Sequence, residues 1–168
     1  MIDVHIVYTP ERDPPLDGIM RLLRREPVRV RIVIGARGRL GFCRAKAISE
    51  SKAEWVSWVD PDDRIEPGLF RVLEEATTPE AKMVHCWEYE HPVDGGEPKI
   101  NRFAHHGMII RRAAALPYLP TMMAAGENHP ELPLQALRPA VTVPWPGYHW
   151  HRRRGSLTLP LERGAPQD

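Results

Sequence analysis

The chain has 168 residues, of which 42% are hydrophobic and 27% are charged, and its formal net charge is +1. This composition excludes disordered and fibrous proteins and fits one globular domain with a hydrophobic core. Cys43 and Cys86 match no disulfide or metal pattern, and no apolar run has the length of a membrane span or a signal peptide. We therefore expect a cytoplasmic protein with two reduced thiols.

The first part of the chain alternates strand-like and helix-like patterns. Residues 2–9 predict a strand, and apolar residues at helical spacing follow it from Leu16 to Leu23. A second strand is expected over 28–35, a helix over 42–52 and a third strand over 54–59. Alternating strands and helices predict an α/β, Rossmann-like domain with a mostly parallel central sheet flanked by helices.

The second part of the chain is less regular. A helix is expected over 66–76, a strand over 82–90, a turn at 93–97 and further strands or a hairpin over 99–112. The proline-rich remainder after Ala113 predicts loops, short helices and an edge strand.

Three aspartates, Asp60, Asp62 and Asp63, directly follow the third expected strand in the stretch "SWVDPDDRIEPG". In an open α/β sheet the ligand crevice lies beyond the carboxyl ends of the strands. Neighbouring carboxylates repel one another unless a cation intervenes, and Mg²⁺ or Mn²⁺ prefers such oxygen ligands and also bridges diphosphates. The pattern favours a site for a metal and a phosphorylated ligand; the alternative is an acidic turn in which Asp63 or Glu66 caps the next helix.

The segment "CRAKAISESKAEWVSWVDPDD" (43–63) resembles the donor-binding segment of family 2 GT-A glycosyltransferases. The common form of that segment is A-R-N-x-G-I-x-x-A-x-G-E-Y, followed by an apolar strand and D-x-D-D. The register holds without a gap at Arg44, Ile48, Ser51, Glu54 and Trp55. The departures from the pattern are Ala45, Ala47 and Ala53.

A second stretch, "YHWHRRRGSLT" (148–158), is similar to the closing pattern of the same family. The resemblance implies a minimal GT-A-like domain over residues 1–158 and a flexible tail over 159–168. It also implies a nucleotide-sugar donor, a UDP-sugar first, and a Mn²⁺ or Mg²⁺ cofactor.

The resemblance further implies roles for particular residues. Asp62 is the expected metal ligand and catalytic residue, with His149 or His151 as a further ligand, although each histidine also fits a basic surface. The expected donor-binding residues are Thr9, Pro10, Arg37, Arg44 and Asp60.

The expected catalytic base is Glu127, because the family's usual Glu-Asp pair reads Glu127-Asn128 here and Glu131 lies just behind it. A carboxylate base implies an inverting hexosyltransferase. The alternatives are that Glu127 is only a charge at a helix start, or that the chain retains configuration or is inactive.

The acceptor is expected in solution. Arginine clusters over 21–39 and 152–154 would suit DNA, and compact enzymes of this type in bacteriophages glycosylate hydroxymethylated bases, which would place the protein in the host cytoplasm. A saccharide or a small molecule is the alternative acceptor, because Trp145, Tyr148 and Trp150 would stack on a sugar as well as on a base. A third reading is a non-catalytic nucleic-acid-binding module that uses the arginines alone.

Overall fold

The computed structural model describes residues 1–11, 13–103, 105–126 and 129–152. Its strands and helices, in chain order, are β1 (Ile2–Tyr8), α1 (Asp17–Leu23), β2 (Val28–Ile34), α2 (Leu40–Glu50), β3 (Trp55–Trp58), β4 (Arg64–Ile65), α3 (Leu69–Glu75), β5 (Met83–His91), β6 (Lys99–Asn101), β7 (Met108–Arg111), α4 (Arg112–Ala115), the 3₁₀ helix η1 (Leu116–Tyr118), α5 (Leu119–Ala124), α6 (Leu132–Gln135) and β8 (Ala140–His151). The elements expected from residue 2 to residue 91 therefore form close to their predicted bounds. Within the described ranges, every helix is too short or too polar to span a bilayer.

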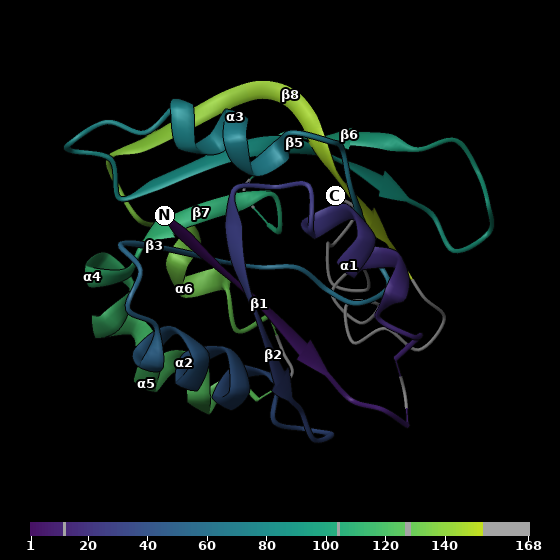
Figure 1. Cartoon of the computed structure of the whole chain (residues 1–168), viewed down its shortest axis with the longest axis horizontal. Coiled ribbons are helices and arrows are strands. Elements are labelled where there is room, and N and C mark those ends of the chain that lie inside the picture. Colours follow the sequence, from purple (N-terminus) through teal and green to yellow (C-terminus); the bar gives the residue numbers. More distant parts are fainter. Residues whose placement is uncertain (12, 104, 127–128, 153–168) are drawn as a thin grey trace, which may run out of the picture.

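The strands form a single curled sheet in the order β2-β1-β3-β7-β5-β8-β4, with β6 paired to β5 (Figure 1). The expected α/β class is confirmed, and β2, β1 and β3 are parallel to one another as predicted. The rest of the sheet is mixed, because β7 lies antiparallel between β3 and β5. The chain between β5 and β7 is a hairpin connection rather than a helical crossover, and such a connection gives antiparallel neighbours.

The last strand, β8, lies inside the sheet and not at its edge as the sequence suggested. It runs parallel to β5 and pairs with β4 on its other side. Proline lacks the N–H that a regular ladder needs, which is why the stretch around Pro144 and Pro146 reads as a loop. The strand accommodates both prolines at register shifts opposite Cys86–Glu88, and regular pairing resumes at Tyr148.

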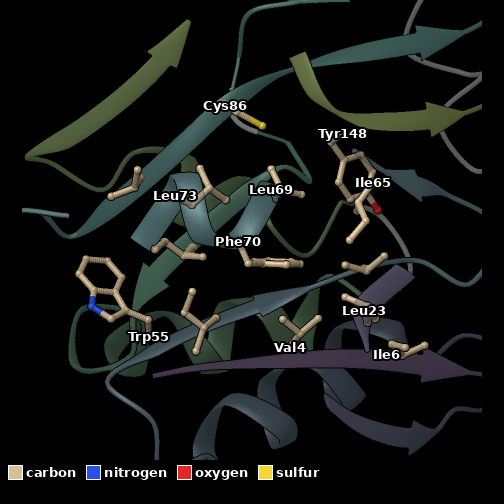
Figure 2. Close-up of a cluster of buried hydrophobic side chains, with 14 of the residues drawn as sticks. Val4, Ile6, Leu23, Trp55, Ile65, Leu69, Phe70, Leu73, Cys86 and Tyr148 are labelled. Atoms are coloured by element: carbon tan, nitrogen blue, oxygen red, sulfur yellow. The ribbon is translucent and has the colours of Figure 1, made fainter. Parts of the chain in front are cut away.

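Two hydrophobic clusters cover the two faces of the sheet. One contains Phe70 and Leu73 of α3, Leu23 of α1, and Val4 of β1, which pack together in Figure 2. The other joins α2, α5 and α6 to the opposite face and surrounds Trp58. Strand β2 lies at the sheet edge, and Ile32 and Ile34 are exposed, whereas Val28 and Val30, at alternating positions of the same strand, are partly buried.

Helices α2 and α5 lie side by side on one face of the sheet (Figure 1). Their contact depends on Gly41, whose N–H donates to the carbonyl of Gly126 over 2.6 Å. A Cβ at position 41 would lie 2.0 Å from the carbonyl oxygen of Met122. The close approach fixes the beginning of α2, the helix that carries Arg44.

We expect Gly41→Ala to lower the free energy of unfolding by about 1–3 kcal/mol, because backbone rather than a movable side chain blocks the new methyl group. Gly18→Ala is the matched control: apart from the adjacent residues and the backbone of its own helix, no atom lies within 4 Å of the added Cβ. Alanine at this helical position should be neutral or stabilise by up to about 1 kcal/mol. Urea unfolding of the two variants measures both effects, and equal stabilities would contradict the tight α2–α5 contact.

Candidate functional site

The carboxyl ends of β1, β2 and β3 meet at one edge of the sheet, because these three strands are mutually parallel. The segments that leave this edge begin at Thr9, Gly35 and Val59. The edge therefore brings together Thr9 and Pro10, the segment of Arg37, and the three aspartates, which are far apart in the sequence.

The segments after β1 and β2 contact each other directly. The N–H of Gly35 donates to the carbonyl of Tyr8 over 2.8 Å. A Cβ at Gly35 would lie 2.9 Å from the Thr9 hydroxyl oxygen, so glycine permits this approach. The N–H of Thr9 donates to the carboxylate of Asp13 over 2.7 Å. Pro10 and Arg37 are exposed beside this contact.

The aspartate segment is held by the last strand. The hydroxyl of Tyr148 donates to Asp63 over 2.8 Å, and the N–H of His151 donates to the other oxygen of the same carboxylate over 2.9 Å. The N–H of Asp60 donates to the Tyr148 oxygen over 3.3 Å. Burial and the charge of Asp63 raise the pKa of Tyr148 well above its usual value, so the hydroxyl keeps the proton that it donates.

Arg44 lies behind Asp60 and connects it to a second carboxylate. The guanidinium is 2.6 Å from Asp60 through Nη2 and 3.0 Å from Glu131 through Nη1. It also lies over the ring of Trp58, 5.2 Å from the ring centroid. Burial disfavours the charge of Arg44, but the two carboxylates more than offset this and raise its pKa. Burial likewise opposes ionisation of Asp60, yet Arg44 and His106 hold the pKa of that carboxyl well below its usual range.

His106 contributes a second buried positive charge. Its Nε2 lies 3.4 Å from Asp60, its Nδ1 lies 3.6 Å from Glu88, and its ring stacks on Tyr148. Burial alone would lower the pKa of His106, but the two carboxylates raise it well above its usual value. His106 is therefore protonated at neutral pH.

The adjacent His105 faces Glu131. Its Nε2 lies 3.3 Å from a Glu131 oxygen, and Nδ1 of His129 lies 3.2 Å from the same oxygen. Burial and the charge of His106 lower the pKa of His105, whereas the contact with Glu131 raises the pKa of His129. Burial opposes ionisation of Glu131, but its contacts with the two histidines and Arg44 keep its pKa well below the usual range.

The structure places the two predicted histidine ligands, His149 and His151, two residues apart on β8, where both contact the ring of His91. His149 contacts Glu66 at 2.7 Å and His91 at 3.0 Å, away from the Arg44 contacts. The ring of His151 stacks on His91, and the charges of Asp63 and Asp62 raise its pKa. The predicted metal ligands Asp62 and His151 are thus electrostatically coupled. The predicted catalytic base, Glu127, lies outside the described residues.

Three groups of side chains in the described part of the chain have donor atoms close enough to share a metal ion. They are Asp60, Asp63 and His106; Glu88, His105 and His106; and His105, His129 and Glu131. The first group joins two residues of the aspartate segment to His106, and its carboxylate oxygens suit Mn²⁺, whereas the protonated ring of His106 has no free lone pair for a metal. The donor atoms in each group lie within 4.8 Å of one another.

Sequence reasoning did not single out Glu88, His105, His106 or His129. The available signals were the adjacent histidines in the stretch "HHGMII" and a glutamate within the predicted strand over 82–90. Glu88 is fully buried in the structure. Because a glutamate is rarely buried without a partner, a glutamate in a predicted buried strand indicates a polar site nearby.

The fold of this chain is similar to that of known proteins, although its sequence is not. No protein-family model matches the chain, and no curated protein matches its sequence. Staphylococcus aureus TarS residues 1–349 bound to UDP-GlcNAc has a similar structure, with a TM-score of 0.54 and 13% identity over 92% of this chain and 59% of TarS 1–349. The UDP complex of TarS 1–349 gives a TM-score of 0.57 and 14% identity over 90% of this chain and 60% of that one.

A glycosyltransferase involved in the glycosylation of the major capsid of PBCV-1 is also similar, with a TM-score of 0.52 and 13% identity over 85% of this chain and 81% of that one. At these identities the likeness establishes the fold. The chain has the α/β fold of GT-A-like glycosyltransferases, as the resemblance implied, and it spans about three fifths of the TarS segment.

Replacing Arg44 tests how far the site depends on this one side chain. We expect Arg44→Met to lower the free energy of unfolding by about 3–5 kcal/mol, because it removes the guanidinium from two charged carboxylates and leaves them only their histidine contacts. Arg44→Lys keeps the positive charge but lacks the planar guanidinium. Its free energy of unfolding should therefore lie between those of Arg44→Met and the wild type. Urea unfolding at pH 7 measures the order, and Arg71→Met on the exposed face of α3 is the control, expected within about 0.5 kcal/mol of wild type. Similar losses for positions 44 and 71 would contradict the buried ion-pair network.

Proposed function

We propose that the protein is a metal-dependent glycosyltransferase that moves a sugar from a nucleotide-sugar donor, a UDP-sugar first, to a hydroxyl acceptor. The observation that carries this proposal is the meeting of three segments at the carboxyl edge of parallel strands in a GT-A-like fold. These segments contain Thr9–Pro10, Gly35–Arg37 and Asp60–Asp63, which supply polar groups, a cation and carboxylates. The structurally similar TarS, crystallised with UDP and with UDP-GlcNAc, supports the choice of donor.

The residues at the carboxyl edge of β1, β2 and β3 would contact different parts of such a donor. Thr9, Pro10 and Arg37 lie on the segments after β1 and β2, where they would contact the nucleotide. Asp60 is ionised and fixed by Arg44, so it presents its carboxylate in one orientation to the ribose or the sugar. The oxygens of Asp62 and Asp63 and the ring of His151 are the groups that would hold Mn²⁺ or Mg²⁺. When bound, such an ion neutralises the charge that develops on a departing diphosphate.

The acceptor's proton needs a base in an inverting reaction. Glu131 is a poor base, because its carboxylate is bonded to Arg44, His105 and His129 and its pKa is held low. This engagement favours Glu127 as the catalytic base, with inversion of configuration. Glu131 then positions Arg44 rather than accepting a proton.

DNA that carries a hydroxymethylated base is the acceptor that we favour. Exposed Arg21, Arg24 and Arg25 lie at the end of α1, and exposed Arg37 and Arg39 lie after β2. Arg37 and Arg39 follow the carboxyl end of β2 beside the proposed donor site, where they would contact a polyanion, whereas Arg21, Arg24 and Arg25 precede the amino end of β2 at the opposite edge of the sheet. Trp150 lies against His105 near the ionised carboxylates and would stack on a base or a sugar.

The metal assignment predicts that Asp62→Ala abolishes the Mn²⁺-dependent stabilisation of the protein by UDP. Bound ligand stabilises the native state by mass action, by about 2.7 kcal/mol at one hundred times its dissociation constant. Thermal unfolding with UDP, with and without Mn²⁺, measures this gain. Asp94→Ala, which removes an exposed aspartate from the turn after β5, is the control and should keep the full gain. Equal Mn²⁺-dependent shifts in the two variants would refute the role of Asp62.

The acceptor assignment predicts a mass increase of one hexose on 5-hydroxymethylcytosine and none on cytosine, because only the modified base offers a primary hydroxyl. DNA of each kind is incubated with the protein, Mn²⁺ and a set of nucleotide sugars, then digested, and its nucleosides are weighed. DNA affinity should also fall steeply with salt, since phosphate contacts release counterions. Transfer only to small saccharides or phenolic alcohols would move the acceptor to that class. Salt-sensitive DNA binding without UDP binding or transfer would instead indicate a non-catalytic nucleic-acid-binding module.

A further inference from the structure

We propose that His105, His129 and Glu131 form a Zn²⁺ site that is separate from the aspartates of the donor site. The proposal does not depend on the glycosyltransferase assignment. It rests on the spacing of three donor atoms, on the side chains that support them, and on the ligand types.

The donor atoms already have the spacing of a tetrahedral zinc site. Zinc lies about 2.0–2.1 Å from imidazole nitrogen and carboxylate oxygen, so ligand atoms around it are about 3.3 Å apart. One oxygen of Glu131 is 3.3 Å from Nε2 of His105 and 3.2 Å from Nδ1 of His129. All three donor atoms lie within 4.8 Å of one another, so a modest movement of one ring completes the triangle.

Each of two ligands has a charged side chain behind it, hydrogen-bonded in the case of Glu131 and nearby without a hydrogen bond in the case of His105. The second oxygen of Glu131 accepts a hydrogen bond from Arg44 over 3.0 Å, which leaves the first oxygen directed at the histidines. The Nδ1 of His105 is buried and lies 3.8 Å from a carboxylate oxygen of Glu88, while its Nε2 faces Glu131. In protein zinc sites a carboxylate usually accepts a hydrogen bond from the remote nitrogen of a histidine ligand, which fixes the ring and raises its basicity. Glu88 would take this role if the 3.8 Å separation from Nδ1 shortened on metal binding.

The ligand types distinguish this site from the aspartate segment. Two imidazoles and one carboxylate suit zinc, whereas Mg²⁺ and Mn²⁺ prefer sites richer in oxygen. Three protein ligands also leave a fourth position for water or another small ligand. Because Arg44 contacts both Glu131 and Asp60, a bound ion would tie the segment at 129–131 to the donor side of the domain.

The test uses Co²⁺ as a spectroscopic substitute for zinc on the full chain after removal of metals by a chelator. We expect one equivalent of Co²⁺ to give the intense visible absorption of a four-coordinate ion, and Zn²⁺ to displace it. His129→Ala and His105→Ala should each weaken Co²⁺ and Zn²⁺ affinity at least tenfold. His91→Ala is the matched control, because it removes a histidine from the other histidine group, with His149 and His151, and should leave the affinity unchanged.

The alternative is that the three side chains form only a hydrogen-bonded ion cluster. Absence of the Co²⁺ absorption, or absorption that survives in a folded His129→Ala protein, would overturn the zinc site. Loss of the Co²⁺ absorption in His91→Ala would also overturn the zinc site. Circular dichroism reports folding of each variant, and His129 remains informative if His105→Ala does not fold, because it lies on a half-buried segment outside the helices and strands. Mn²⁺-dependent UDP binding is measured on the same samples, so failure of the zinc site leaves the donor assignment separately testable.

Discussion

The buried guanidinium of Arg44 is the group on which the polar interior of this protein depends. It reaches Asp60 after β3 and Glu131 before α6, two carboxylates separated by more than seventy residues in the sequence. Removing a buried ion from water is costly, and the cost is recovered only when geometry and hydrogen bonds satisfy both partners. Arginine meets this condition because its planar fork donates to two carboxylates in fixed directions, which a lysine cannot do. Helix α2, which contacts α5 closely at Gly41, holds this guanidinium between the two carboxylates.

Tyr148 plays the corresponding part for the aspartate segment. Its hydroxyl joins Asp60 and Asp63, and its ring packs in the hydrophobic cluster and stacks on His106. Figure 2 shows Tyr148 beside Ile65, which lies two residues after Asp63. The side chain of Tyr148 therefore belongs both to the hydrophobic core and to the polar site. Strand β8, although interrupted by prolines, pairs with β5 and β4 and so brings Tyr148 to the aspartate segment.

The sequence predicts the first half of this molecule well and the site only in part. Alternating strands and helices specify the α/β class, because hydrophobic periodicity is a local signal. The aspartates could be assigned to the sheet edge for the same reason. The partners of Asp60 could not, because Arg44, His106 and Tyr148 come from separate elements that only the tertiary fold brings together. The interior position of β8 was also missed, because its prolines hide the strand pattern and the register shifts that accommodate them are not local.

The adjacent histidines show how the fold assigns different chemistry to identical side chains. His106 lies between Asp60 and Glu88, and their charges raise its pKa enough to keep it protonated. His105 lies beside that charge, and burial together with repulsion from His106 lowers its pKa and keeps its ring neutral. A protonated imidazole only donates, whereas a neutral one has a nitrogen lone pair for a metal ion or a proton. The cationic ring thus belongs with the aspartate segment, and the neutral ring with Glu131 and His129, so two neighbouring positions in the chain serve two distinct groups of carboxylates.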